Sequence, residues 1–235
     1  MVPKLYVGFD VRMPDAYMVA ARSAVDKCSI PLQVEPLVLP HLRACRAYTR
    51  TTLNNGGVMW DEISDAPMST QFAISRFLIP MLSGFKGQAL FCDNDFLFRF
   101  DPAELFTEEA KKYAVMVVKH QYEPTDSLKM DGQLQTTYAR KNWSSFIVWN
   151  CDHPANSWLT VDNVNKTTGR DLHRFCWLQD EEIGELHPEW NWLEGHSSAE
   201  INPKAVHYTR GTPDMPGHEN TPYSEEWWQT LRSIT

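Results

Sequence analysis

The sequence has no run of about 18 consecutive apolar residues, the length that a membrane-spanning helix needs, so we expect no membrane span. It also lacks an excess of positive charge, because 22 Lys and Arg against 30 Asp and Glu give a formal net charge of −8. A protein that binds the nucleic-acid backbone normally presents a basic surface, so we expect no nucleic-acid partner. The five cysteines are an odd number with no CxxC spacing, which predicts free thiols and a cytoplasmic location. A strand-like segment at 5–9 follows Met1 so closely that we expect no signal peptide.

The composition is typical of a globular protein with a sizeable core, since 43% of the residues are hydrophobic and 22% are charged. The 235 residues show no internal repeat, low-complexity tract or linker, which favours a single domain over 1–235. Nine tryptophans and eight tyrosines suit a sugar-binding site as well as a packed core, so composition alone leaves both uses open.

Short apolar strands alternate with helical patterns over the first hundred residues, and this alternation predicts an α/β sheet with helices on both faces. Pro36 places the second strand at an edge of the sheet. The segment 121–143 is polar and is expected to be a long loop or ribbon. Strands are expected at 5–9, 32–39, within 88–98 on both sides of two aspartates, at 113–119, 145–149 and 204–208; helices are expected at 15–27 with Asp15 as N-cap, at 69–82 with Ser69 as N-cap and Gly84 at the end, and at 224–234.

The most distinctive motif is Asp93-Asn94-Asp95, which interrupts the apolar stretch 88–98. Buried carboxylates are costly unless they are paired, hydrogen-bonded or bound to a cation. In a strand, residues i and i+2 point to the same side, so Asp93 and Asp95 can present two hard oxygen ligands at one place. Such ligands suit Mg²⁺ or Mn²⁺ carrying a phosphate group, whereas the alternative is a simple polar turn. Asp10 also follows a strand, and ligands of α/β sheets bind beyond the carboxyl ends of strands.

The order of seven segments resembles the GT-A glycosyltransferases, most of all family 8 and its small bacterial and phage relatives. The resemblance implies a single GT-A (Rossmann-like) domain over 1–235, with a mixed central sheet and helices on both faces. It also implies transfer of a hexose from a UDP-sugar to an acceptor hydroxyl or to water, with retention, and Mn²⁺ (or Mg²⁺) as cofactor. The acceptor is then a small molecule, a glycan or another hydroxyl compound. The matching segments are YVGFD at 6–10, SRFLIP at 75–80, FCDND at 91–95, the strand at 142–150, WLQDEE at 177–182, PEWN at 188–191 and VHY at 206–208.

The same resemblance implies a set of site residues. Asp93, Asp95 and His207 would hold the metal, although a lone strand histidine is more often a structural hydrogen-bonding group. The chain departs from family 8 after His207, where the family's lysine is missing and Arg210 is the alternative contact for the diphosphate. The implied nucleotide-sugar-binding residues are Phe9, Asp10, Arg12, Arg76, Asp93, Asn94, Ser144, Ser145, Trp190, Asn191 and Arg210.

Several of these residues have plainer interpretations. Asp10 is the type of residue that caps a helix or begins a turn, and Arg76 is a type that forms surface ion pairs. Trp190 either stacks on a sugar face or packs beneath its loop, and Ser144 and Ser145 fit ordinary strand positions.

The cluster Asp180-Glu181-Glu182 is the expected source of a catalytic carboxylate, as a nucleophile, as a base or as a stabiliser of positive charge on the sugar. The alternative is a solvated acidic helix start, where carboxylates favour the helix dipole.

Three other classes of protein share parts of the pattern. A phosphatase of the haloacid dehalogenase type has its DxD motif after the first strand, whereas this motif lies in the middle of the chain. A nucleotidyltransferase requires a loop rich in glycine and lysine near the first strand, which 8–12 does not provide. A non-catalytic module that binds nucleotide-sugars remains open on residue types alone.

Overall fold

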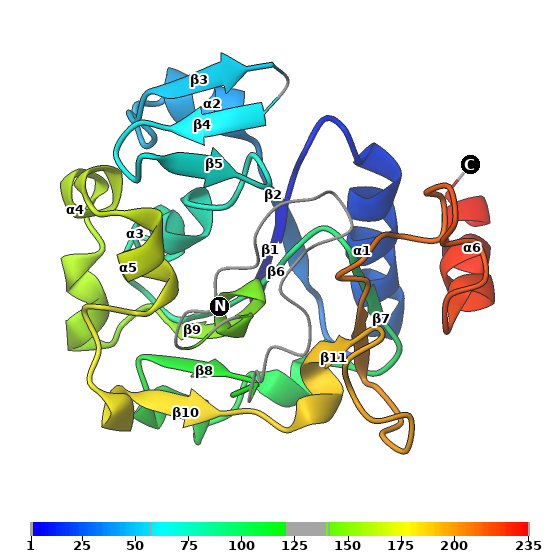
Figure 1. The fold of residues 1–235 in the computed structure, drawn as a ribbon. Coiled ribbons are helices and arrows are strands. Elements are labelled where there is room, and N and C mark those ends of the chain that lie inside the picture. Colours follow the sequence, from blue (N-terminus) through cyan, green and yellow to red (C-terminus); the bar gives the residue numbers. More distant parts are fainter. Residues whose placement is uncertain (1, 57, 121–139, 141, 235) are drawn as a thin grey trace.

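The computed structural model describes residues 2–56, 58–120, 140 and 142–234 (Figure 1). Most of the segment 121–143, expected to be a loop or ribbon, lies outside the described residues. All five cysteines are free, as predicted. Among the described residues, no helix is both long enough and apolar enough to cross a membrane. That the whole chain forms one domain stays a prediction.

A mixed six-stranded sheet forms the centre of the fold, with strand order β10-β8-β9-β6-β1-β2 (Figure 1). Strand β1 is parallel to both of its neighbours, and β9 is antiparallel to β6 and β8. Pro36 lies in β2 at the edge of this sheet, as predicted, where its missing N–H leaves no inner strand unpaired. The strands are β1 (Lys4–Gly8), β2 (Gln33–Leu37), β6 (Gln88–Cys92), β8 (Val115–Val117), β9 (Phe146–Asn150) and β10 (Ile183–Glu185).

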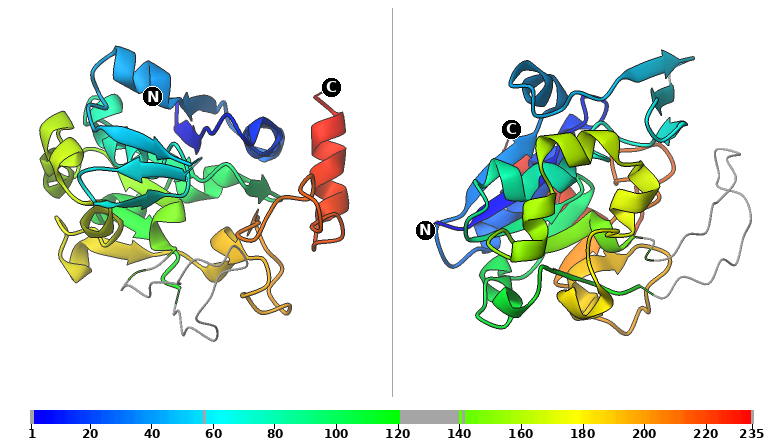
Figure 2. Two further views of the ribbon diagram at one scale, coloured as in Figure 1. Left: turned by 45° about the horizontal axis from the view of Figure 1, so that its top comes forward. Right: turned by 90° about the vertical axis from the view of Figure 1, so that its left-hand side faces the viewer.

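Helices cover both faces of this sheet, which confirms the predicted α/β architecture (Figures 1 and 2). Alternate strand residues point to opposite faces. Leu5 and Val7 pack with α1 on one face, whereas Tyr6 and Phe91 pack with the segments around α3, α4 and α5 on the other. The helices are α1 (Pro14–Lys27), α2 (Leu39–Ala44), α3 (Ile79–Leu82), α4 (Val161–Lys166), α5 (Gly169–His173) and α6 (Ser224–Arg232).

A second sheet of three strands begins directly after the two aspartates. It has the order β11-β12-β7, where β12 (Ala205–His207) is antiparallel to β7 (Phe96–Phe98) and parallel to β11 (Trp192–Leu193). The expected strands on both sides of Asp93 and Asp95 are therefore present, as β6 and β7, but the two strands do not pair with each other. Strand β6 stays in the central sheet, and the three-residue connection redirects the chain into the second sheet. Helix α6 packs beside α1 over this second sheet.

A third sheet, formed by β3 (Thr52–Asn55), β4 (Val58–Asp61) and β5 (Ala66–Met68), was not expected. It is anchored by the buried ion pair between Arg50 and Asp61. Arg50 also donates hydrogen bonds to the C=O groups of Val164 and Thr167, at the end of α4. Figure 2 shows this sheet, in cyan, on the outside of the molecule.

Two details of the expected helices were wrong. Helix α1 begins at Pro14 after Met13, so Asp15 lies in its first turn and is not the N-cap. The segment 69–82 is helical only from Ser75, as a 3-10 turn followed by the short α3. Pro80 explains the break, because proline has no N–H to continue a preceding helix and is instead tolerated in a first turn. Gly84 follows α3 with φ +65°, as expected of a residue at a helix end.

Candidate functional site

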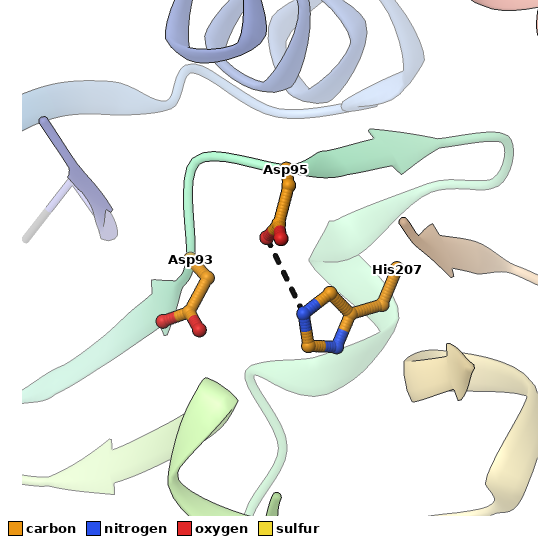
Figure 3. A group of neighbouring side chains, drawn as sticks. All are labelled: Asp93, Asp95 and His207. Carbon is orange, nitrogen blue, oxygen red and sulfur yellow. Dashed lines mark ion pairs between the residues drawn. The ribbon is translucent and has the colours of Figure 1, made fainter. Parts of the chain in front are cut away.

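The side chains of Asp93, Asp95 and His207 converge at the junction of the central sheet and the second sheet (Figure 3). One ligand atom from each lies within 4.8 Å of the other two. The backbone fixes this arrangement, because the N–H of Asp93 donates to the C=O of Ser145 at 2.9 Å and the N–H of Tyr208 donates to the C=O of Asp95 at 3.0 Å. The aspartates therefore meet through a connection between two sheets, and not through the alternation of a single strand.

The orientation of His207 is set by Asn191, the last residue of a 3-10 turn just before β11. Ser145 donates its hydroxyl hydrogen to the C=O of Asn142 at 2.7 Å, so its oxygen accepts a hydrogen bond from Nδ2 of Asn191 at 2.9 Å. This leaves Oδ1 of Asn191 to accept a hydrogen bond from Nδ1–H of His207 at 3.0 Å. The ring is further held by stacking on Phe96, with centroids 4.4 Å apart. A neutral His207 held in this way presents the lone pair of Nε2.

That lone pair faces Asp95. Nε2 of His207 lies 3.3 Å from Oδ1 of Asp95, the contact drawn as a dashed line in Figure 3. Oδ1 of Asp95 is buried and accepts no hydrogen bond from the described residues. Two electron-rich atoms at this separation repel one another unless a proton or a cation lies between them. Two carboxylates and one imidazole are a donor set suited to Mn²⁺ or Mg²⁺, so the residues fit a divalent cation.

Arg76 provides the only positive side chain that the described residues show in contact with this group. Its Nη1 lies 2.7 Å from Oδ1 of Asp93 and donates to the C=O of Ser144 at 2.7 Å. The guanidinium is buried between the rings of Phe72 and Phe91. Burial raises the pKa of Asp93, Arg76 lowers it, and the nearby charge of Asp95 raises it further, so that the pKa of Asp93 is above its usual value. Arg76 is thus no surface residue, and it neutralises only one of the two carboxylates.

Asp10, at the end of β1, is engaged by its neighbours. Its Oδ1 accepts hydrogen bonds from the N–H and Nε of Arg12, and its Oδ2 accepts from Nη2 of Arg12 and the N–H of Gln71. Burial raises the pKa of Asp10, but these hydrogen bonds lower it more, and the carboxyl stays ionised. The structure therefore shows Asp10 and Arg12 as a pair that fixes the loop after β1. Phe9 lies beside this pair and packs edge-on against Tyr17.

Asn94 is buried between the two aspartates and donates to the C=O of Met13 at 3.5 Å, just before α1. It links the connection that carries Asp93 and Asp95 to the loop that carries Asp10.

Ser144 and Ser145 are buried beside Asp93, and both form hydrogen bonds through their backbone C=O and hydroxyl groups. Oγ of Ser144 lies 2.6 Å from Nδ1 of His173, whose pKa is lowered to about 3 by burial and by the charge of Arg76. The sequence offered no signal for His173, because its contact with Ser144 depends on the packing of α5.

The roles of Trp190 and Arg210 at the donor stay predictions. Trp190 is 4% exposed and stacks on Phe146 in the core, with Lys204 over its ring, which is the packing interpretation. Arg210 is exposed, and its Nη2 donates to the C=O of Gly195 at 3.4 Å. The structure brings neither side chain into contact with Asp93, Asp95 or His207.

The acidic cluster forms a 3-10 turn, Asp180–Glu182, that leads into the start of β10. Asp180 pairs with Arg140, and Glu182 accepts from the N–H of Gln179, while Glu181 is exposed. Since β10 and β8 are parallel, it is the far end of β10, at Glu185, that shares an edge of the sheet with Asp93. The described contacts of the cluster do not include Asp93, Asp95 or His207, and its catalytic role stays a prediction.

The comparison with known sequences found one clear relative. Protein CDI of Arabidopsis thaliana is 42% identical to this chain over 229 residues, which are 95% of the chain and 84% of that protein. No family model matches the chain.

Several solved structures share its fold. The galactosyltransferase LgtC, solved with donor and acceptor sugar analogs, superposes with a TM-score of 0.61 at 13% identity, covering 98% of this chain and 95% of LgtC. GlyE of Streptococcus pneumoniae gives a TM-score of 0.59 at 12% identity, and the chain spans 98% of its own length and 60% of GlyE. Mouse xyloside xylosyltransferase 1 gives a TM-score of 0.52 at 12% identity, over 89% of this chain and 98% of that protein. At these identities the likeness is one of fold.

Proposed function

Because this chain belongs to the family of Arabidopsis protein CDI and has the GT-A glycosyltransferase fold, we propose that it is a metal-dependent glycosyltransferase. Its donor is a UDP-sugar, from which it moves a hexose to an acceptor hydroxyl or to water, with retention of configuration. The assignment to family 8 in particular stays a prediction.

One observation carries this proposal: Asp93, Asp95 and His207 converge at one point between two sheets, with Nε2 of His207 directed at Asp95. Such a group, with Arg76 neutralising only one carboxylate, retains a net charge of −1 and favours a divalent cation. When bound, Mn²⁺ or Mg²⁺ would act as a Lewis acid that stabilises negative charge on a leaving diphosphate.

The surrounding residues supply binding and orientation. Asn191 keeps Nε2 of His207 free to act as a ligand, and Arg76 keeps Asp93 ionised in a buried place. Phe9, Asp10, Arg12 and Asn94 form the end of β1 and its neighbouring connection, where we place the nucleotide.

The reaction has a simple balance. The bond between the anomeric carbon and the oxygen of the β-phosphate breaks, and that electron pair leaves with UDP. The acceptor oxygen forms the new bond to the anomeric carbon, and its proton passes to the departing phosphate oxygen of UDP. We place the sugar beside Ser144, Ser145 and Arg76, and the carboxylates of Asp180, Glu181 and Glu182 remain the proposed source of the group on its reacting face.

Calorimetry of UDP binding tests the metal part of the proposal. UDP is expected to bind at least about tenfold more tightly with Mn²⁺ than with a chelator, and His207→Ala should abolish that difference without a large change in melting temperature. His41→Ala, at an exposed histidine of α2, is the matched control. Equal UDP affinity with and without metal would show that Asp93, Asp95 and His207 do not form a metal bridge.

A screen of UDP-sugars with Mn²⁺, following UDP release, tests the catalytic part. UDP binding without release from any donor would favour a non-catalytic binding module. Formation of a nucleotide-sugar from UTP and a sugar phosphate would favour a nucleotidyltransferase. Proton NMR of the first product, before mutarotation, tests retention, since a β-linked product from an α-linked donor would indicate inversion.

A further inference from the structure

Glu194 is a buried carboxylate directly after β11, next to the strand that carries His207. Its N–H donates to the C=O of His207 at 3.0 Å, and the preceding Leu193 is paired with His207 across the two strands. The residue is 8% exposed, and its Oε2 has no hydrogen-bond partner among the described residues. A buried carboxylate oxygen without a hydrogen-bond donor lowers the stability of the fold. This cost points to a role for Glu194 in binding another molecule.

A second unpartnered oxygen lies in the loop that follows His207. Oγ1 of Thr212 is buried and has no partner among the described residues. The loop rests on the turn that contains Glu194, because Oγ1 of Thr209 donates to the C=O of Glu194 at 3.5 Å and Arg210 donates to the C=O of Gly195. Its tip, at Thr209 and Arg210, reaches the surface. Glu194 and Thr212 therefore occupy two adjoining segments beside a metal ligand.

Glu194 lies on a different side of the proposed metal site from the residues beside which we place the donor sugar. Arg76 and Ser144 adjoin Asp93 on the side of the central sheet, whereas Glu194 adjoins His207 on the side of the second sheet. Glu194 is not among the carboxylates that converge for a cation. Its negative charge also repels a diphosphate, so the group that it binds is not the diphosphate of the donor.

We infer that Glu194 and Thr212 bind hydroxyl groups of the acceptor, an inference that rests on the proposed glycosyl transfer. The carboxylate accepts a hydrogen bond from one hydroxyl, and the threonine hydroxyl donates to or accepts from a second. Neighbouring hydroxyls that offer both kinds of group are typical of sugars and other polyols. We place this subsite between the turn at Glu194–Gly195 and the loop at 209–212, on the side of the second sheet.

The test compares wild type, Glu194→Gln and Thr212→Val, with Glu200→Gln as a control at a nearby exposed glutamate. Saturation-transfer NMR measures binding of lactose, maltose, cellobiose and glycerol, each with and without UDP and Mg²⁺. Calorimetry measures UDP affinity, and thermal unfolding gives the melting temperature. Wild type is expected to bind at least one of these polyols. Glu194→Gln should weaken that binding about tenfold or more, the effect of losing a charge-assisted hydrogen bond, with UDP affinity within about twofold.

The melting temperature separates a binding role from a structural one. Because Glu194→Gln removes a buried charge with an unpartnered oxygen, it is expected to raise the melting temperature by a few degrees. A lower melting temperature with unchanged polyol binding would make Glu194 structural and overturn the inference. A parallel loss of UDP affinity would place Glu194 in the donor site, and a wild type that binds UDP but no polyol would also contradict the inference. Failure of wild type to bind UDP counts against the proposed function, while the measurements without UDP still decide the role of Glu194.

Discussion

Replacing Asn191 by leucine removes the side chain that holds His207 in the tautomer suited to metal binding. Oδ1 of Asn191 accepts from Nδ1–H of His207, and its Nδ2 donates to Oγ of Ser145. Leucine has nearly the same shape and can do neither. His207 is then free to carry its proton on Nε2, the atom that faces Asp95, and a protonated nitrogen cannot act as a ligand.

The magnitudes follow from these two hydrogen bonds. Losing a second-shell partner of a histidine ligand typically lowers metal affinity about 10- to 100-fold. Losing two buried hydrogen bonds costs about 2 kcal/mol in the free energy of unfolding, which corresponds to a melting temperature lower by about 4–8 °C. Asn191→Asp keeps an acceptor for Nδ1–H, so we expect it to bind metal more tightly than Asn191→Leu.

Calorimetric titration of Mn²⁺ in the presence of UDP measures the effect, with Asn156→Leu as the control. Asn156 is equally buried and donates to the C=O groups of Ala114 and Asn150, away from the ligands. It should lower the melting temperature by a similar amount and leave Mn²⁺ affinity unchanged. If Asn191→Leu binds Mn²⁺ within about twofold of wild type, or if both variants weaken it equally, the reasoning about the tautomer is wrong.

Two further predictions concern His173 and the acidic cluster. The pKa of His173 is lowered to about 3 by burial and by Arg76. In the unfolded chain the same histidine takes up a proton near pH 6.5. The free energy of unfolding therefore falls as the pH drops from about 6.5 towards 3, by about 3 kcal/mol at pH 4. His173→Gln does not titrate and should flatten the decline of melting temperature between pH 7 and pH 4; an unchanged slope would contradict this assignment. Glu181→Gln and Asp180→Asn should lower turnover more than they weaken UDP binding, relative to Glu62→Gln as a control at an exposed glutamate directly after β4. Turnover equal to wild type in both would remove the cluster from the mechanism.

The sequence predicted those strands and helices whose apolar pattern lies within one short segment. The strand at 4–8, the helix after it and the apolar run before Asp93 were recognisable, because alternation and helical spacing are properties of short segments. The edge position of Pro36 followed from the missing N–H of proline.

Features that depend on distant contacts could not be predicted in the same way. Asn191 was expected at the donor, but its contact with His207 exists only because β11 pairs with β12. Arg50 and Asp61 look like surface residues in the sequence, and only the packing of the third sheet buries them together. The sequence around Trp190 is the same whether the ring stacks on a sugar or on Phe146, so it could not decide between the two.

The location of Asp93 and Asp95 between two sheets also affects which part of the protein unfolds first. A cation held there would fasten the central sheet to β7 and β12, so that its binding free energy would oppose their separation. Without the cation, its binding free energy no longer stabilises the contact between the two sheets, while the two carboxylates still repel one another. Sub-global opening is then easiest for the second sheet together with α6, and amide protons in β7, β11 and β12 exchange with solvent before those of β1 and β6.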